Sequence, residues 1–423
     1  MEHQAREQRN KRIDTVVFLV LLLGFSCLMG YLFYRQCTGS EQSYHSDMKA
    51  YILEMQGLDS GYSFPYPILF WVGRCFDLLF SPEMAMALAT MTLNSISLVA
   101  VKWVLNKVTL KSLQEAMGKR DWAAGVLISV IAVSLFFVSM VYPPGEIYLP
   151  GIIRDYLGVF SGNPYYNATY MAARPFGILA FYQYGVLLDR YEMGCSGKWT
   201  GGTRGVDLRE YFLFAGSLLL ATMAKPSSTI VLVGAAGLIM LYRLIRRKLR
   251  NFKPTLWLGL CFVPTFLNLL YQYSGVFVPR DGGEGGIGFT FGKVWGRYCE
   301  NIPLAIGLAV GFPILVFLLN YKELKQNSIY RFSWQIYWMG FAMAFFLYEK
   351  GFRERDFNFC WGYMYGIFFA FVGALLVLIM ATTRKKHPFL LAMQWLAYGW
   401  HLICGIYYFS LIYGGAMYYS VRW

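Results

Sequence analysis

The residue best suited to chemistry is Asp47, a carboxylate that follows the first long apolar run of the chain. Ser46 is a good helix N-cap residue, and it would make Asp47 an early helical residue stabilised by the helix dipole. The same carboxylate could instead act as a general base or bind an acceptor hydroxyl. His45 could assist it through a hydrogen bond or by binding a metal, although a single loop histidine is more often only solvated. The local sequence supports the structural and the chemical interpretation about equally.

A second candidate is Lys225, which lies between two apolar runs in LLLATMAKPSSTIVLV, residues 218–233. Pro226 breaks the helical pattern, and the serines after it can cap a returning helix. The lysine could simply extend its ammonium to polar surroundings. A cation beside a helix N-terminus is also a ready phosphate site, because the dipole and the ammonium both attract an anion.

Other charged candidates lie in the segments that connect the apolar runs. Arginine binds phosphate through two parallel hydrogen bonds, so arginines gathered on one face would favour anion binding. The alternating signs of EKGFRERDF also allow these side chains to pair with one another on the surface. The substrate-binding candidates besides His45 and Lys225 are Arg174, Arg280, Glu349, Arg353 and Arg355.

The chain that carries these residues has the composition of an integral membrane protein. Of its 423 residues, 57% are hydrophobic and 15% are charged, whereas soluble domains contain about 25% charged residues. The apolar runs are continuous, which favours helices over a β-barrel. We predict an all-α transmembrane domain over residues 1–423 with about eleven spans. The spans lie near 14–36, 83–106, 123–142, 171–190, 210–224, 227–243, 255–275, 302–320, 333–349, 359–381 and 389–414.

The net charge of +14 is explained by orientation in a membrane rather than by a nucleic-acid partner. The basic residues concentrate in short loops that alternate with the spans, as the positive-inside rule requires. The first apolar run is too long for a signal peptide and no small-residue cleavage site follows it, so we expect a retained first span with a cytoplasmic N-terminus.

The first outer loop, residues 37–82, is predicted to hold two interfacial helices, at 46–56 and 65–80. The second carries Arg74 and Asp77 on one face and is short for a span. If it crossed the membrane, every later basic loop would face outward, so an amphipathic helix in the interface is the better interpretation. Residues 143–170, 276–301 and 350–358 would form further outer loops.

No cofactor is indicated by the remaining motifs. The eight cysteines occur singly, which argues against a zinc site, although a disulfide among Cys37, Cys299 and Cys360 is conceivable. A divalent cation could take part, but no metal ligand set can be named. Asn167 begins an N-A-T glycosylation sequon, a pattern that is common by chance.

The order of these features resembles the GT-C superfamily of membrane glycosyltransferases, which take sugars from polyprenyl-phosphate carriers. In that family an acidic residue and an aromatic open the first outer loop, and a Pro-rich interfacial helix precedes the second span. The stretch SDMKAYILEMQG…FPYPILFWVGRCFDLLFSPEMAMAL, from Ser46 onward, looks like this arrangement. MAKPSS, residues 223–228, looks like a variant of the L-x-K-G-P turn of bacterial aminoarabinose and protein mannosyl transferases. The usual Asp-Glu pair is reduced to Asp47-Met48, Lys-Gly-Pro becomes Lys225-Pro226, and beyond residue 250 the likeness rests on topology.

The resemblance implies transfer of a sugar, with inversion, from a polyprenyl-phosphate-linked donor to a glycan, lipid or cell-wall acceptor. The reaction would take place on the extracytoplasmic face of the cell membrane, among membrane lipids. Asp47 would be catalytic, and Lys225 would face the carrier phosphate with Arg280, Arg353 or Arg355. Four aromatic residues could stack on a sugar, although the aromatic belts of membrane proteins explain most such residues: Trp71, Tyr165, Tyr166 and Trp361.

A polyprenyl-linked polysaccharide polymerase or a flippase is the main alternative. Such proteins also combine many spans with arginine-rich outer loops, but they are expected to lack a first-loop carboxylate followed by interfacial helices. A secondary transporter should carry ionisable residues at mid-membrane depth and broken helices in matching halves. The span centres of this chain are almost free of charge, which counts against transport.

Overall fold

The computed structural model describes residues 2–40, 42–141, 158–195, 208–276, 286–299, 301–384 and 387–416. Helices form nearly all of it, with one small two-stranded sheet. The helices are α1 (Glu2–Thr38), α2 (Met48–Gln56), α3 (Ile68–Asp77), α4 (Pro82–Met117), α5 (Trp122–Ser134), α6 (Ala168–Cys195), α7 (Leu208–Ala224), α8 (Pro226–Arg246), α9 (Phe252–Leu260), α10 (Val263–Val276), α11 (Ile302–Leu319), α12 (Glu323–Gln326), α13 (Ser328–Phe346), α14 (Cys360–Thr383) and α15 (Pro388–Tyr413). Short 3₁₀ turns η1 (Gly118–Arg120), η2 (Leu135–Phe137), η3 (Trp295–Arg297) and η4 (Gly351–Asp356) join them, and strand β1 (Ile287–Phe289) pairs antiparallel with β2 (Leu347–Glu349).

The helices support an all-α membrane protein. Within the described ranges, six are long and apolar enough to cross a bilayer, namely α1, α4, α8, α11, α14 and α15. A seventh span results if α9 and α10, which meet at a 50° bend, are counted together. Each predicted span overlaps at least one helix, and the span at 255–275 is divided between α9 and α10. Helix α5 has only 13 residues and α7 only 17, so they are short for a crossing. The predicted number of spans and their orientation stay predictions.

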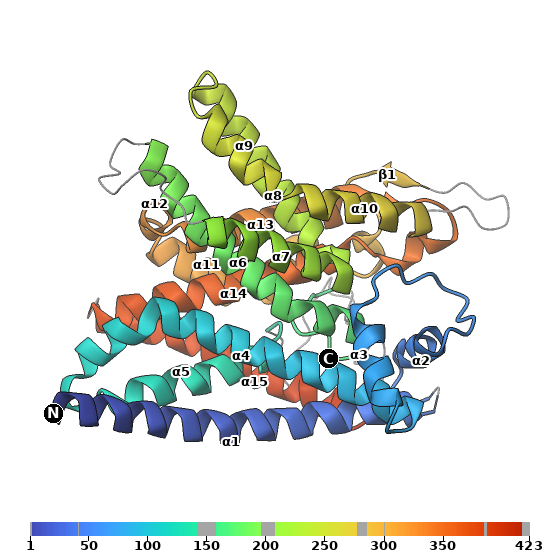
Figure 1. Ribbon diagram of the computed structural model, residues 1–423, viewed down its shortest axis with the longest axis horizontal. Helices are drawn as coiled ribbons and strands as arrows, with labels where there is room; N and C mark the ends of the chain where they lie inside the picture. The colour runs from blue at the N-terminus through green and yellow to red at the C-terminus, as the bar shows by residue number, and fades with distance from the viewer. Residues whose placement is uncertain are drawn as a thin grey trace.

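Helix α14 is the centre of the molecule. It runs between a group formed by α1, α4, α5 and α15 and a second group that contains α6, α7 and α13 (Figure 1). Nearly all of its residues are buried, as expected for a helix that is apolar on every face. Small residues allow the close contact with α13, because a Cβ at Gly366 would lie 2.9 Å from Tyr337 Cα. Close backbone approach through small residues is the usual basis of helix packing in membranes.

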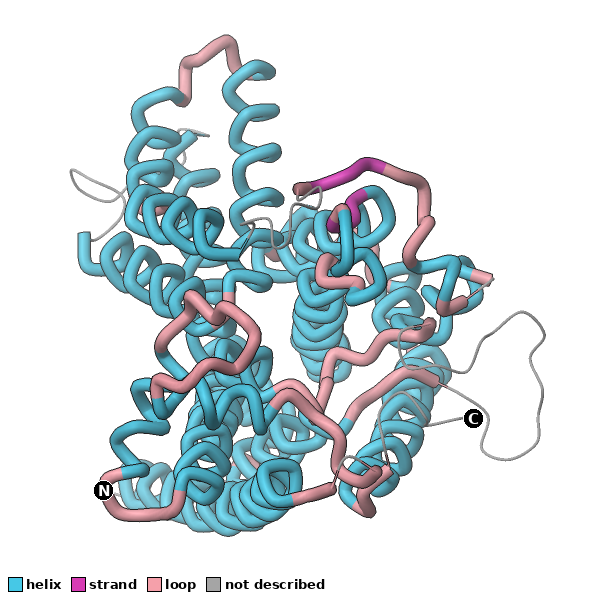
Figure 2. The backbone as a smooth tube through the Cα atoms, turned by 90° about the vertical axis from the view of Figure 1, so that its right-hand side faces the viewer, coloured by secondary structure: helices cyan, strands magenta, loops and turns pink. Residues whose placement is uncertain are grey.

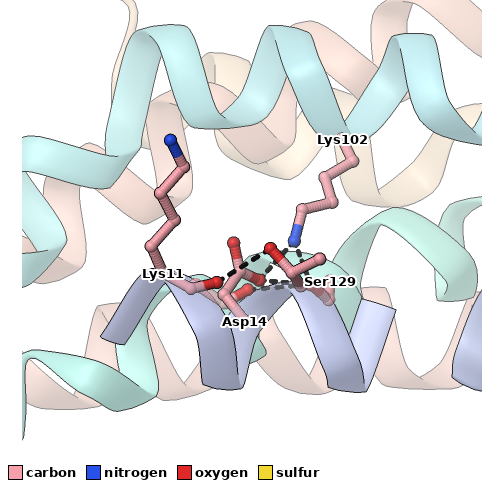
Figure 3. Close-up of polar contacts among 6 residues, drawn as sticks. Lys11, Asp14, Lys102 and Ser129 are labelled. Atoms are coloured by element: carbon pink, nitrogen blue, oxygen red, sulfur yellow. Dashed lines mark hydrogen bonds and ion pairs between the residues drawn. The ribbon is translucent and has the colours of Figure 1, made fainter. Parts of the chain in front are cut away.

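An ionic cluster is buried where α1, α4 and α5 meet. The Lys102 ammonium of α4 pairs with the Asp14 carboxylate of α1 and donates to Ser129 Oγ of α5 at 2.5 Å (Figure 3). Ser129 Oγ also lies 2.9 Å from Asp14 Oδ1, and the side chain of Lys102 is only 9% exposed. Asp14 and Lys102 lie near the ends of the predicted spans 14–36 and 83–106 rather than at their centres, and their charges neutralise each other between helices that are distant in sequence.

Helix α11 is broken at Val310, whose φ of −131° and ψ of 27° leave the helical region. The amide N–H of Phe312, near the break, donates to His401 Nε2 of α15 at 3.2 Å. The other ring nitrogen of His401 lies 2.7 Å from the Ser139 carbonyl oxygen, which fixes the proton on Nδ1. The histidine thus satisfies the backbone groups that the break and the adjacent extended segment leave unpaired.

Gly405 lets α15 pack directly against the backbone of the segment that follows α5. A Cβ at this position would lie 1.8 Å from the Phe137 carbonyl oxygen. We predict that Gly405→Ala lowers the free energy of unfolding by about 1–3 kcal/mol, because the added methyl group has no space. Gly399→Ala on the same helix is the matched control, since a methyl group added there would have no atom within 4 Å. Reversible unfolding in mixed micelles measures both, and equal stability of the two variants would contradict the prediction.

The segment between α1 and α4 contains α2 and α3, two short helices that lie within the ranges 46–56 and 65–80 predicted for interfacial helices. Arg74 of α3 donates to the Met55 carbonyl oxygen at 2.8 Å and so joins the two helices. The chain before α2 is bonded to the end of α15. The Tyr44 N–H donates to the Gly415 carbonyl oxygen at 3.1 Å, and the Tyr44 hydroxyl donates to the Tyr413 carbonyl oxygen at 3.2 Å. These contacts fix the position at which α2 begins.

Candidate functional site

Asp47 is the cap residue that precedes α2, one position later than the sequence suggested for the cap. Its side chain makes no capping hydrogen bond. Instead, Oδ2 accepts from the Tyr51 hydroxyl at 3.1 Å and from Asn167 Nδ2 at 3.3 Å. The side chain is exposed, and both bonds use one oxygen, so Oδ1 remains available to a ligand. The carboxylate is thus oriented by its neighbours but open on one side.

Lys225 occupies the cap position of α8 with an extended backbone (φ −169°, ψ 126°), directly before Pro226. It is buried, with 7% of the residue exposed. Its ammonium donates to Asn167 Oδ1 and to Thr169 Oγ1, both at 2.9 Å. It also lies 4.5 Å from the centre of the Trp361 ring. A lysine has three N–H groups, so these two hydrogen bonds leave one for an anion.

Asn167 joins the two charged residues. Its amide nitrogen donates to Asp47 and its oxygen accepts from Lys225, so the carboxylate and the ammonium belong to one network without touching. A second path runs from Asp47 through the Tyr51 hydroxyl to Thr169 Oγ1, 3.2 Å away, and on to Lys225. Asn167 is only 2% exposed, so the N-A-T pattern marks the centre of this site rather than an accessible glycosylation acceptor. Its role is not predictable from the sequence, because the sequon is the only pattern that marks Asn167.

The position of Lys225 changes its proton affinity. Burial lowers the pKa of its ammonium from 10.5 to about 8, although Asp47 and Cys360 act in the opposite direction. Arg353 adds to the lowering, which indicates that its guanidinium shares the electrostatic environment of the site. The charged form is therefore retained at neutral pH but lost at moderately alkaline pH.

We predict that the lowered pKa of Lys225 is visible in the pH dependence of stability. Between pH 8 and pH 10.5 the unfolded chain holds a proton that the folded chain has released, so stability rises with pH in that window. Relative to Lys225→Met, the wild-type protein should gain about 1–3 kcal/mol between pH 7.5 and pH 9.5. Denaturation of both proteins across this range measures the difference. A difference that stays constant with pH would contradict an ammonium with a lowered pKa.

Glu349 and Arg353 form a second charged group next to Lys225. Arg353 Nε lies 3.6 Å from Glu349 Oε2 and 3.0 Å from Asp356 Oδ2. Glu349 also accepts from Asn358 Nδ2 at 2.8 Å. Burial raises the pKa of the Glu349 carboxyl, while the Asn358 hydrogen bond and the charge of Arg353 oppose this. Arg353 is therefore already paired, and an anionic substrate would share it with these carboxylates.

A cavity of about 270 Å³ extends from this region between α8, α10, α13 and α14. Ser227 and Pro226, which follow Lys225, form one part of its wall, and Glu349 with Asn358 forms another. Most of the remaining wall is apolar, with Ile230, Leu269, Met343 and Phe359 among the lining residues. An apolar cavity with a few polar groups at one end is typical of a site for an amphiphilic ligand.

Of the other predicted site residues, His45 and Arg355 are exposed, and Arg280 lies outside the described residues. Arg174 is fully buried and donates to the Gly162 carbonyl oxygen at 2.9 Å, with the rings of Phe136, Tyr170 and Phe368 around it. These contacts stabilise the buried segment that leads to Asn167, and a role of Arg174 in substrate binding stays a prediction.

No metal centre is formed by the described residues, in which no three His, Cys, Asp or Glu side chains gather. Cys37, Cys299 and Cys360 are buried, and no disulfide joins them. No protein-family model matches the chain, and no curated protein matches it either.

Proposed function

We propose that the protein is a membrane glycosyltransferase that moves a sugar from a polyprenyl-phosphate-linked donor to an acceptor hydroxyl. The observation that supports this best is the network that links Asp47 to Lys225 through Asn167. Displacement at an anomeric carbon needs a base for the acceptor and positive charge for the departing phosphate. The adjacent apolar cavity offers surface for the lipid part of the donor.

In this mechanism the acceptor oxygen attacks the anomeric carbon while Asp47 Oδ1 takes the hydroxyl proton. The bond between the anomeric carbon and the phosphate oxygen breaks, and its electron pair leaves with the polyprenyl phosphate. Lys225, supported by Arg353, offsets the negative charge that develops on this leaving group. Asn167 bonds both Asp47 and Lys225 and so fixes their relative positions. The configuration at the anomeric carbon is inverted.

We further propose that the site faces the extracytoplasmic side of the cell membrane. With a cytoplasmic N-terminus and about eleven spans, the basic loops lie inside and the turn at Lys225 lies outside together with α2 and α3. At this level the site would meet the phosphate of a membrane-embedded donor.

The proposal is tested with purified protein, a polyprenyl-phosphate sugar and a mixture of candidate glycan and lipid acceptors. We expect release of polyprenyl phosphate that depends on the acceptor and on intact Asp47. Absence of release with every sugar donor, from protein that is folded and monodisperse, would contradict glycosyl transfer.

Secondary transport is the second candidate, because Lys102 and Asp14 pair within two candidate spans and α11 is broken. Ionisable residues and interrupted helices at membrane depth are typical of transporters. Uptake into proteoliposomes driven by an ion gradient, sensitive to Lys102→Met but not to Asp47→Asn, would favour transport over sugar transfer.

A further inference from the structure

The α8–α9 tip, residues 243–253, projects from the rest of the molecule as the end of a helical hairpin (Figures 1 and 2). Helix α8 leads to it from Lys225 over 21 residues, a length of about 32 Å. This length, measured along the helix, is about the thickness of a bilayer core. If α8 crosses the bilayer, as its length and composition allow, a ligand of the tip would bind at the face opposite the candidate site.

Four exposed cations are concentrated at this tip. Arg246, Lys248, Arg250 and Lys253 are exposed, and none of them forms an ion pair within the described residues. The sequence contains no Asp or Glu between Glu210 and Asp281. Some other basic residues predicted to lie inside are paired, namely Arg6 with Asp121, Arg190 with Glu210 and Arg384 with Glu323. The four exposed cations of the tip have no such ion pair among the described residues.

Apolar side chains flank these cations. Ile245 is 69% exposed, Leu249 62% and Phe252 54%, so apolar and charged groups alternate on one small surface. The tip is also held in place by hydrogen bonds to Tyr191, near the end of α6. The buried Asn251 amide donates to the Tyr191 hydroxyl, which also shares a hydrogen bond with the Thr255 hydroxyl. A surface that combines exposed cations with apolar anchors matches the headgroup layer of a membrane with acidic lipids.

We infer that the α8–α9 tip binds the headgroups of acidic phospholipids in the cytoplasmic leaflet. The cations contact the phosphates, while Ile245, Leu249 and Phe252 enter the adjoining acyl region. A soluble acidic protein or free phosphate would leave these apolar side chains without a partner. The inference is independent of the proposed sugar transfer.

The experiment uses the full-length protein, freed of co-purified lipid in detergent and titrated with dioleoyl phosphatidylglycerol or dioleoyl phosphatidylcholine. Native mass spectrometry counts the bound lipid. We expect phosphatidylglycerol to bind in preference to phosphatidylcholine. Arg246→Gln/Lys248→Gln/Arg250→Gln/Lys253→Gln should weaken that binding at least about tenfold, with an unchanged thermal midpoint.

The matched control removes four exposed cations elsewhere on the same predicted side, in Lys107→Gln/Lys111→Gln/Lys119→Gln/Arg120→Gln, and should retain the lipid. Equal losses in both variants, or no loss in the first, would overturn the assignment. Displacement of the lipid by millimolar inorganic phosphate, or by a polyglutamate peptide, would also overturn it by identifying a general anion site.

Discussion

Asp47→Asn should reduce the release of polyprenyl phosphate by a factor of about 10² to 10⁴, the range expected when a general base is lost. The amide cannot take the proton of the acceptor hydroxyl, yet it keeps the size of the carboxylate. Because the Asp47 side chain is exposed, the substitution should leave the thermal midpoint nearly unchanged. The measurement is the initial rate of carrier phosphate release, with donor binding followed separately.

Asp59→Asn is the matched control, because Asp59 is an exposed carboxylate of the same loop that accepts from the Gly61 amide. An asparagine can accept the same bond, so activity should persist. Full activity of the Asp47→Asn variant would remove the base from the mechanism. Equal losses in the two variants would indicate a general effect of charge in this loop.

Lys102→Met should lower the free energy of unfolding by about 3–5 kcal/mol, since it leaves the Asp14 carboxylate without its cation between three helices. Only 17% of the Asp14 side chain is exposed, so water cannot replace the ammonium well. The loss should be measured by reversible unfolding in mixed micelles, where the reference state keeps the chain in an apolar environment.

Two further variants separate the ion pair from the loss of a lysine. Asp14→Asn/Lys102→Met should recover most of the stability, because no charge then remains buried. Lys107→Met, on the same helix, changes an exposed lysine and should have little effect. If the double variant is as unstable as Lys102→Met, packing rather than charge is responsible.

The sequence was sufficient to predict the helices and the position of Lys225. Continuous apolar runs can bury themselves only as helices in a membrane, and a proline directly after a lysine predicts the start of a helix at that point. The pairing of Arg353 with nearby carboxylates could also be expected, because the signs of the charges alternate in EKGFRERDF. These features depend on residues that are close in sequence.

The contacts between distant segments were not predictable in the same way. Asn167 is separated from Asp47 by 120 residues and Lys102 from Asp14 by 88, so only the packing of α14 and its neighbours decides that they meet. From the sequence alone, a lysine near the end of an apolar run, such as Lys102, could equally extend its ammonium to the membrane surface or form a buried ion pair. The sequence also does not predict whether the short helices α5 and α7 cross the membrane, because this depends on how neighbouring helices pack against them.

The contact of Tyr44 with the end of α15 has a practical consequence for expression. Gly415 has a φ of +97°, and a Cβ there would lie 2.9 Å from the Tyr44 ring, so neither truncation before it nor replacement by a bulkier residue is tolerated without moving residue 44. A fluorescent protein or purification tag fused close to Ala416 would disturb the contacts of Tyr44 and so displace the segment that leads to Asp47. Fusions at the amino terminus, at the far end of α1, avoid this and are the better choice for assays of the isolated protein.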